Sequence, residues 1–283
     1  MVAVANQPPT RSTAGFTQDF PFQLYANSGV GNPFFYHNFE DDFDNSLAIT
    51  GSYTVSKGST GTAAEAAGDG GLGLLTTAAT NNDYVSLQLP AAGFVLPQGS
   101  QVGKKLIYGV RLQLSDVTAS AFIAGLCNTT ATLWTAGDIT DGVYFSKASG
   151  GTVLNLITAS GGTALTWAIP TAAYALANAT NIDLGFYIDK FQNINVFVGS
   201  QLVGFIPQSG SGAVNTSTGV SILPVLGPQL QIVGPANPFG VSGNQLGPWT
   251  VSAANLNLTL SLQAGAAAAK TLTVDFHGCM KER

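Results

Sequence analysis

The side chains that most enzymes use for acid–base and metal chemistry are scarce in this sequence. Asp, Glu, Lys and Arg make up 9% of 283 residues, against roughly 25% in an average soluble domain. The glutamates and histidines are Glu40, Glu65, Glu282, His37 and His277. Gly, Ala, Thr, Ser and Asn dominate the rest, together with short alternating runs of Leu, Val, Ile and Phe. This composition favours a β-rich scaffold, and we expect a protein that is not an enzyme and has no catalytic residues.

One cluster of carboxylates has the spacing that sugar hydrolysis requires. In the run Glu40-Asp41-Asp42-Phe43-Asp44, residues 40, 42 and 44 share one face if the run is a strand. Hydrolysis of a glycoside by general acid and base needs such a pair. The run lies at the start of the predicted domain and not in a central strand, so solvated acids at an edge are the favoured interpretation. Asp183 and Asp189 flank another predicted strand at opposite ends, too far apart to act together.

Metal and phosphate chemistry find little support. Asn81-Asn82-Asp83 and the run 138–141 carry oxygen ligands of the kind that calcium prefers, but neither holds a full ligand set, and turn formation explains both. Two cysteines and two histidines at unsuitable spacing predict no zinc site. The glycine-rich run 68–73 lacks a lysine and a following helix, which a phosphate-binding loop needs. We therefore expect no cofactor and no metal.

Charge, cysteines and hydropathy limit the partners and the compartment. The net charge is −5, and the longest basic run is Lys104-Lys105, so we expect no direct nucleic-acid contact. No signal peptide is visible in residues 1–15, and no stretch of 18 apolar residues predicts a membrane span. Cys127 and Cys279 are read as two reduced thiols of a protein made in a reducing cytoplasm, although pairing between them stays open at this point.

The elements that would position any site are strands. Apolar residues alternate with polar or small ones in several runs, each with one apolar face. These runs lie at 106–114, 122–126, 184–188, 194–198, 256–262 and 272–276. Gly-rich turn signals separate them, and no window combines a helical period with a helix cap. Such runs predict antiparallel sheets with one buried side and one wetter side.

Two segments depart from the strand pattern. Residues 1–35 contain prolines and six aromatic residues with no helical or strand period, and we predict an extended N-terminal arm that either packs over its own domain or docks on a neighbouring subunit. Residues 36–283 form the predicted β-sandwich domain, within which 207–255 is an irregular, loop-rich insertion. The arm anchors that we expect at a protein interface are Phe16, Phe20, Phe22, Tyr25, Phe34 and Phe35.

The order of the strand motifs resembles a known family. The run at 104–118 leads to 122–126, then 141–145, 184–189, 194–199, 202–204 and 272–276, and the acidic-aromatic start at 39–44 precedes them. Over residues 39–277 this order is similar to that of the concanavalin A-like (laminin G-like) jelly roll, and especially to the decoration or cement proteins of tailed bacteriophages. The resemblance implies an all-β sandwich of two curved antiparallel sheets with adjacent terminal strands.

The function that the resemblance implies is that of a virion structural protein. We expect a capsid decoration (cement) protein that stabilises a phage head by contacts with the major capsid protein and with neighbouring copies of itself. It would be a homo-oligomer, with a trimer suited to local threefold axes, located in the virion after assembly in the host cytoplasm.

A second hypothesis belongs to a different class. The domain could be a carbohydrate-binding, lectin-like module of a phage tail fibre or host-recognition structure. That function needs exposed aromatic residues on the concave face of the sandwich, for which Trp134, Trp167 and Trp249 are the candidates, although packing in the core or in loops is the favoured interpretation of all three. A glycoside hydrolase is the third hypothesis.

Overall fold

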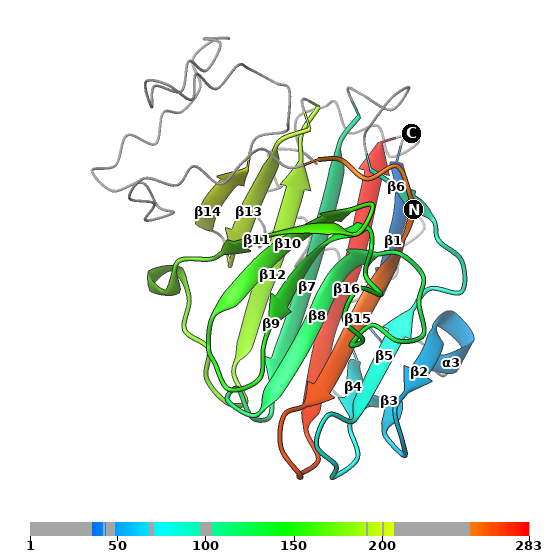
Figure 1. Cartoon of the computed structure of the whole chain (residues 1–283), viewed down its shortest axis with the longest axis vertical. Coiled ribbons are helices and arrows are strands. Elements are labelled where there is room, and N and C mark those ends of the chain that lie inside the picture. Colours follow the sequence, from blue (N-terminus) through cyan, green and yellow to red (C-terminus); the bar gives the residue numbers. More distant parts are fainter. Residues whose placement is uncertain are drawn as a thin grey trace, which may run out of the picture.

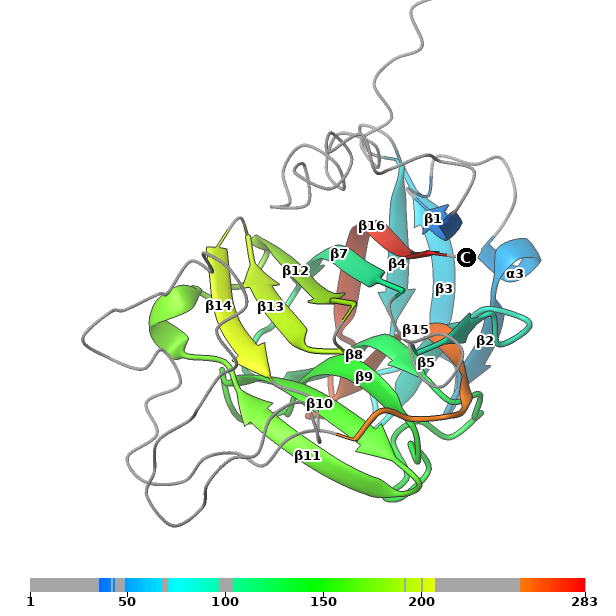
Figure 2. The ribbon, with the colours of Figure 1, turned by 90° about the horizontal axis from the view of Figure 1, so that it is seen from above.

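The computed structural model is a β-sandwich. It describes residues 36–41, 43, 49–67, 71–96, 104–190, 192–199, 201–206 and 250–282. Two eight-stranded antiparallel sheets pack face to face (Figures 1 and 2). The predicted all-β jelly-roll sandwich is confirmed. No helix in these residues is both long and apolar enough to cross a membrane.

The first sheet, sheet A, has the two ends of the described chain side by side. Its path is β14 (Gln201–Ile206), β13 (Ile194–Val198), β12 (Asn181–Ile188), β7 (Leu106–Leu114), β16 (Thr271–Glu282), β4 (Leu72–Thr76) and β3 (Thr62–Ala66). β1 (Tyr36–Asp41) pairs with the second half of β16, with Tyr36 opposite Glu282. The terminal strands are therefore adjacent, as the resemblance implied.

The second sheet, sheet B, is built around β15. Its path is β11 (Thr163–Ala168), β10 (Leu154–Ser160), β9 (Gly142–Lys147), β8 (Ser120–Cys127), β15 (Asn255–Ala264), β5 (Tyr84–Gln88) and β2 (Thr54–Lys57), with β6 (Phe94–Val95) paired to the start of β15. The short helix α3 (Ile49–Ser52) and the 3₁₀ turn η4 (Thr171–Ala173) are the helical elements of the described ranges. The sequence pattern had predicted neither.

The core lies between the sheets and follows the alternation in the sequence. Leu256, Leu258, Leu260 and Leu262 of β15 point inward and are fully buried. From sheet A, the ring of Tyr108 on β7 stacks on Phe186 with centroids 4.9 Å apart. Strands with one apolar residue in two can fill such a core from both sides, which is why the six predicted runs all become strands.

A β-bulge in β16 changes which side chains enter the core. The pairing of β16 with β7 shifts between Val274 and Phe276. The extra residue reverses the inward and outward positions that follow it. Phe276 therefore lies in an outer cluster, and His277 lies in the core opposite Val110. The expectation that Phe276 continues the apolar face of Leu272 and Val274 is wrong for this reason.

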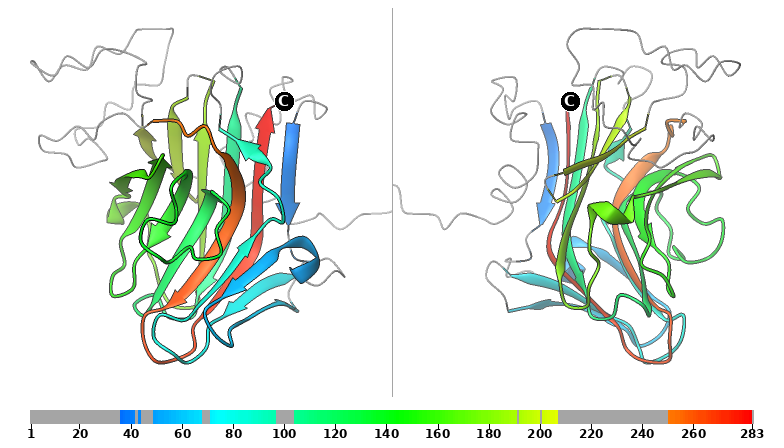
Figure 3. Two further views of the ribbon diagram at one scale, coloured as in Figure 1. Left: turned by 45° about the vertical axis from the view of Figure 1, so that its right-hand side comes forward. Right: turned by 90° about the vertical axis from the view of Figure 1, so that its left-hand side faces the viewer.

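The two sheets bow in the same direction. In both views of Figure 3 the orange β15 bows towards the red β16, so the outer face of sheet B is concave and the outer face of sheet A is convex. We call these the concave face and the convex face.

The two cysteines lie on different sides of the sheets. Cys127 belongs to the concave face and Cys279 to the core side of sheet A. Both are buried free thiols, so the pairing left open above does not form.

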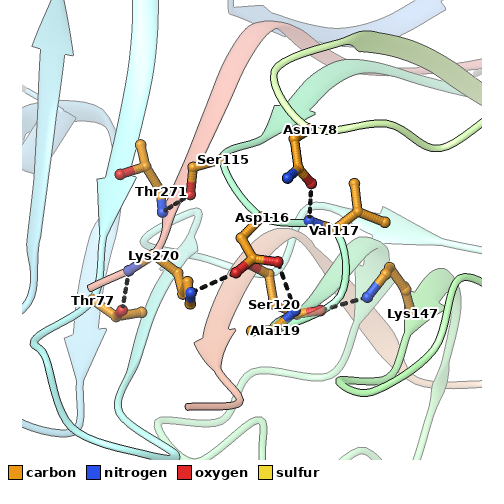
Figure 4. A network of polar contacts seen from close by, with 10 residues as sticks. All are labelled: Thr77, Ser115, Asp116, Val117, Ala119, Ser120, Lys147, Asn178, Lys270 and Thr271. Carbon is orange, nitrogen blue, oxygen red and sulfur yellow. Dashed lines mark hydrogen bonds and ion pairs between the residues drawn. The ribbon is translucent and has the colours of Figure 1, made fainter. Parts of the chain in front are cut away.

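A polar network joins the loops at the end of the sandwich where β15 turns into β16 (Figure 4). Lys270 Nζ lies 2.7 Å from Asp116 Oδ2, and Asp116 Oδ1 accepts a bond from the Ala119 amide. The amine of Lys147, at the end of β9, donates to the carbonyls of Ser120 at 2.6 Å and Ala148 at 3.0 Å. These bonds connect loops from both sheets and fix one end of the sandwich.

Candidate functional site

The concave face carries polar side chains in rows that cross several strands. In one row, Ser56 on β2, Ser86 on β5 and Ser261 on β15 lie opposite one another. The hydroxyls of Ser86 and Ser261 are 2.5 Å apart. The same row continues through Ile123 on β8 to Ser146 on β9. The alternation in β15 thus places hydroxyl and amide groups on this face because its leucines take the core side.

The loop 128–141, between β8 and β9, folds back over this face. Leu133 is buried against Ile123, Cys127 and Tyr144, and Trp134 packs on the same cluster. A sheet face rich in hydroxyls would ordinarily stay wet, but here an apolar patch on β8 and β9 gives the loop a place to bury its own side chains. The loop is therefore a fixed part of the concave face.

Asn128 joins the two ends of this loop. Its side-chain oxygen accepts bonds from the amides of Thr140 at 2.9 Å and Asp141 at 3.1 Å, and its side-chain nitrogen donates to the carbonyl of Asp138 at 2.9 Å. The backbone of Asn128 also donates to the carbonyl of Asp141. Side-chain amides commonly stabilise loop backbone in this way.

Gln88 and Tyr84 of β5 hold the middle of the loop. Gln88 is buried; its oxygen accepts a bond from the Thr130 amide at 3.0 Å, and its nitrogen donates to the Asn128 carbonyl at 3.1 Å. The Tyr84 hydroxyl donates to the carbonyl of Ala131 at 3.2 Å. The sequence analysis did not single out these residues, because their partners are far away in the chain.

Trp134 occupies the centre of the concave face. Its indole nitrogen donates to Ser261 Oγ at 2.7 Å, while the residue as a whole is only half-buried. The indole N–H is the only polar group of this side chain. Because that group is bonded to the sheet, the rest of the side chain is apolar.

The three candidate tryptophans have different outcomes. Trp134 lies on the concave face, half-buried and packed against the cluster around Leu133, so the favoured interpretation of loop packing is confirmed for it. Trp167 of β11 is buried in the core, so for this residue the favoured interpretation of core packing is confirmed. Trp249 lies outside the described residues.

Two buried ionisable groups of this face, the Cys127 thiol and the Tyr144 phenol, stay neutral near pH 7. Burial raises the pKa of the Cys127 thiol well above its usual range, although a hydrogen bond with Thr259 acts against it. Burial, together with nearby Cys127, also raises the pKa of the Tyr144 phenol. At the end of the loop, burial of Asp141 acts to raise its pKa, but hydrogen bonds from Ser252, Gly161 and Thr140 outweigh it and leave that pKa lowered.

The expected turn role of the Asn and Asp clusters agrees with the contacts. Asn82 adopts a left-handed turn conformation, and Asp83 accepts a bond from the Ala78 amide. Asp138 accepts a bond from the Thr132 hydroxyl. No group of three or more His, Cys, Asp or Glu side chains in the described ranges is arranged to hold a metal ion. The contacts of Asn82, Asp83 and Asp138 are thus local turn and loop contacts.

The carboxylates considered for glycoside hydrolysis do not gather on this face. Asp42 and Asp44 lie outside the described residues, and Glu40 is part of β1 at the opposite sheet. Asp183 of β12 forms an ion pair with Arg111 at 2.6 Å on the convex face. In the described strands of sheet B, the pairing register places no Asp, Glu, His, Lys or Arg on the concave face.

The predicted arm anchors Phe16, Phe20, Phe22, Tyr25, Phe34 and Phe35 lie outside the described residues, as do residues 207–249 of the predicted insertion. Their roles and the domain boundary at residue 36 stay predictions.

Comparison with known proteins supports the fold. No protein-family model and no curated protein sequence matches the chain. Among solved structures, an endo-β-1,4-glucuronan lyase from the fungus Trichoderma reesei matches with a TM-score of 0.51 at 10% identity, covering 86% of this chain and 94% of the lyase. A protein of unknown function from Shewanella oneidensis MR-1 gives 0.49 at 12% identity, covering 88% and 87%. The Emp46p carbohydrate recognition domain, in its potassium-bound form, gives 0.49 at 7%, covering 84% and 94%. At 10% identity the match with the lyase concerns the fold alone, which is a jelly-roll sandwich of two antiparallel sheets.

Proposed function

We propose that the protein is a carbohydrate-binding module that holds an uncharged glycan against its concave face. The observation that carries the proposal is Trp134, whose indole N–H is bonded to Ser261 while the residue is only half-buried. An aromatic ring fixed in one orientation is a suitable platform for the C–H face of a sugar ring, because it removes apolar surface from water on both partners.

The surroundings of Trp134 provide polar partners without charge. Half-buried Ser56 and Ser146 lie two strands away from Ser261 on either side, about 10 Å at the usual spacing of neighbouring strands. Hydroxyl groups both donate and accept, as sugar hydroxyls do. The described strands offer no cation on this face to an acidic sugar, so the proposed ligand is neutral.

The decoration role of the sequence analysis remains a prediction that rests on the resemblance, since its anchor residues lie outside the described part of the chain. The absence of enzymatic activity remains a prediction as well. Neither is needed for the proposed glycan binding, which a virion protein or any other protein could carry.

Binding is tested by affinity electrophoresis of the full chain in gels containing soluble neutral polysaccharides such as xylan, mannan or mixed-linkage β-glucan, with alginate and polyglucuronate as acidic counterparts. We expect retardation by a neutral polymer. Trp134→Ala should weaken it at least about tenfold, which corresponds to about 1.4 kcal/mol. Trp134→Phe, which keeps an aromatic ring, should lose less.

The matched control is Phe205→Ala, which removes an exposed aromatic ring from β14 on the convex face and should leave retardation unchanged. Circular dichroism and the thermal midpoint establish that each variant is folded. Equal retardation of the folded Trp134→Ala variant, or binding to acidic polymers alone, would contradict the proposal.

A further inference from the structure

The convex face of sheet A carries an apolar cluster of its own. Ile107 on β7, Phe197 on β13 and Phe276 on β16 form its centre, and Tyr187 and Met280 pack against them. The pairing register places all five on the outer side of the sheet. Phe276 reaches this side through the bulge in β16. The cluster therefore belongs to the surface opposite the proposed glycan site.

A row of glycines crosses the same region. Gly185, Gly109 and Gly278 lie opposite one another on β12, β7 and β16. Glycine places no side chain on the convex face. The backbone is therefore bare between two rows of side chains, one made of Tyr187, Ile107 and Met280 and the other of Asp183, Arg111 and Phe276. Bare backbone flanked by large apolar side chains is a surface on which flat rings can lie closely.

The cluster is more deeply buried than an outer sheet face explains. Ile107 and Phe276 are each 3% exposed and Phe197 is 9% exposed. The apolar described residues that pack against them, Tyr187 and Met280, stand on the same face beside them, and Arg111 lies opposite Phe276. Side chains that stand next to one another on a sheet ordinarily leave their outer ends open to solvent, so a face buried to this extent is suited to a covering layer.

We propose that residues 1–35 of the same chain cover this cluster, with their aromatic side chains packed on the glycine row and on the apolar residues around it. The segment thereby completes the sandwich as a third layer over the convex face.

The entry point of the segment supports this occupant. Residue 36 begins β1, where Tyr36 pairs with Glu282 and Asn38 with Met280. The segment thus joins the sheet next to Met280, at one side of the cluster. From β1 to β14 the sheet is about 24 Å wide at the usual strand spacing. Residues 1–35 can span up to about 115 Å when extended, so the length is sufficient.

The composition of the segment matches the surface. It contains the six aromatic residues Phe16, Phe20, Phe22, Tyr25, Phe34 and Phe35, and its only charged side chains are Arg11 and Asp19. Each large apolar side chain that becomes buried contributes roughly 1.5–3 kcal/mol before ordering costs. Prolines at 8, 9, 21 and 33 are unsuited to a central strand, so packing of side chains on the face is the mode of attachment that we propose.

Photo-crosslinking in the full chain tests this proposal. Phe22 is replaced by the photoreactive residue p-benzoylphenylalanine, which keeps an aromatic ring, and the crosslinked peptides are identified by mass spectrometry after irradiation. We expect crosslinks within one chain to the peptides that contain Ile107, Tyr187 or Met280. The control carries the same photoreactive residue at Val153, an exposed position in the loop between β9 and β10, and should give none of these crosslinks.

A mixture of isotopically light and heavy chains separates the alternatives. Crosslinks from position 22 to the same peptides of another chain would overturn the proposal in favour of an arm that docks on a neighbouring subunit. Crosslinks to sheet B, or none to the convex face, would overturn it as well. As a second measurement, hydroxyl-radical labelling of Met280 should rise several-fold in a full-length variant with Phe16, Phe20 and Phe22 changed to serine, and labelling of Tyr84 on sheet B should not. Unchanged labelling of Met280 would count against the proposal.

Discussion

Replacing Lys147 by methionine should change how the stability of the protein depends on pH. Lys147 is fully buried at the end of β9, and its amine donates to two backbone carbonyls near Asp116 (Figure 4). Burial lowers the pKa of this amine from 10.5 to about 8, although the nearby carboxylate of Asp116 acts in the opposite direction. The folded protein therefore holds this proton less tightly than the unfolded chain does.

The direction of the effect follows from proton uptake. Between pH 8 and 10.5 the unfolded chain keeps a proton at Lys147 that the folded protein has lost, so raising the pH through this window favours the folded state. A difference of about 2.5 pKa units corresponds to about 3 kcal/mol. Below pH 8 both states are protonated, and the wild type carries the full cost of the buried charge.

The measurement is the free energy of unfolding in urea at several pH values from 7 to 10.5, for the wild type and for Lys147→Met. Cys127 and Cys279, whose pKa values are raised by burial, lower stability at alkaline pH, but they do so in both proteins. The difference between the two proteins therefore isolates Lys147. We expect the wild type to gain about 3 kcal/mol relative to the variant across the window.

The matched control is Lys57→Met, because Lys57 is exposed on β2. Substitution at this exposed position should change the free energy of unfolding by no more than about 0.5 kcal/mol. A flat curve for Lys147→Met would refute the reasoning, since it would mean that the Lys147 amine reaches water in the folded state.

Two further predictions concern stability. Gly125→Ala should destabilise the protein by about 1–3 kcal/mol in urea unfolding, because the added Cβ would lie 2.5 Å from the carbonyl oxygen of Val143. The control is Gly151→Ala, which should destabilise far less because nothing lies within 4 Å of its added Cβ. Equal losses of stability in the two variants would contradict the packing argument. His277→Leu should make the protein more resistant to acid. Burial lowers the pKa of His277 to about 3, so between pH 6.5 and 3 the unfolded chain takes up a proton that the folded protein does not. This uptake destabilises the folded wild type by up to about 5 kcal/mol. An unchanged acid midpoint would show that His277 does not control acid unfolding.

Much of the fold could be predicted from the sequence, because alternation is a local property. The leucines at 256, 258, 260 and 262 share one face in any strand, so a large apolar core had to form on that side. The adjacency of the terminal strands, by contrast, came only from the resemblance, and the pairing order of the other strands was not predicted. The strands β10 and β11 were not predicted, although the turn signal Ser160-Gly161-Gly162 lies between them. Their outer positions mix apolar and polar residues, so the alternation is weak there.

The candidate site was less predictable, since its parts come together only in three dimensions. Trp134 was a candidate from the sequence, but nothing in its neighbourhood indicated that its indole would meet Ser261, 127 residues away. The polar side of β15 was expected to be wet; in the structure Thr259 and Ser261 are buried beneath neighbouring side chains and the loop 128–141.

The sequence by itself determined a β-sandwich with a low-charge surface and an inward side for most strands, since these properties depend on composition and on the order of neighbouring residues. The tertiary structure decided which outward residues meet. The bulge at 274–276 turned Phe276 out and His277 in, and the loop over sheet B made Trp134 the centre of the concave face. Bulges and loop packing depend on the opposite strand and on distant partners, and local periodicity carries no information about either.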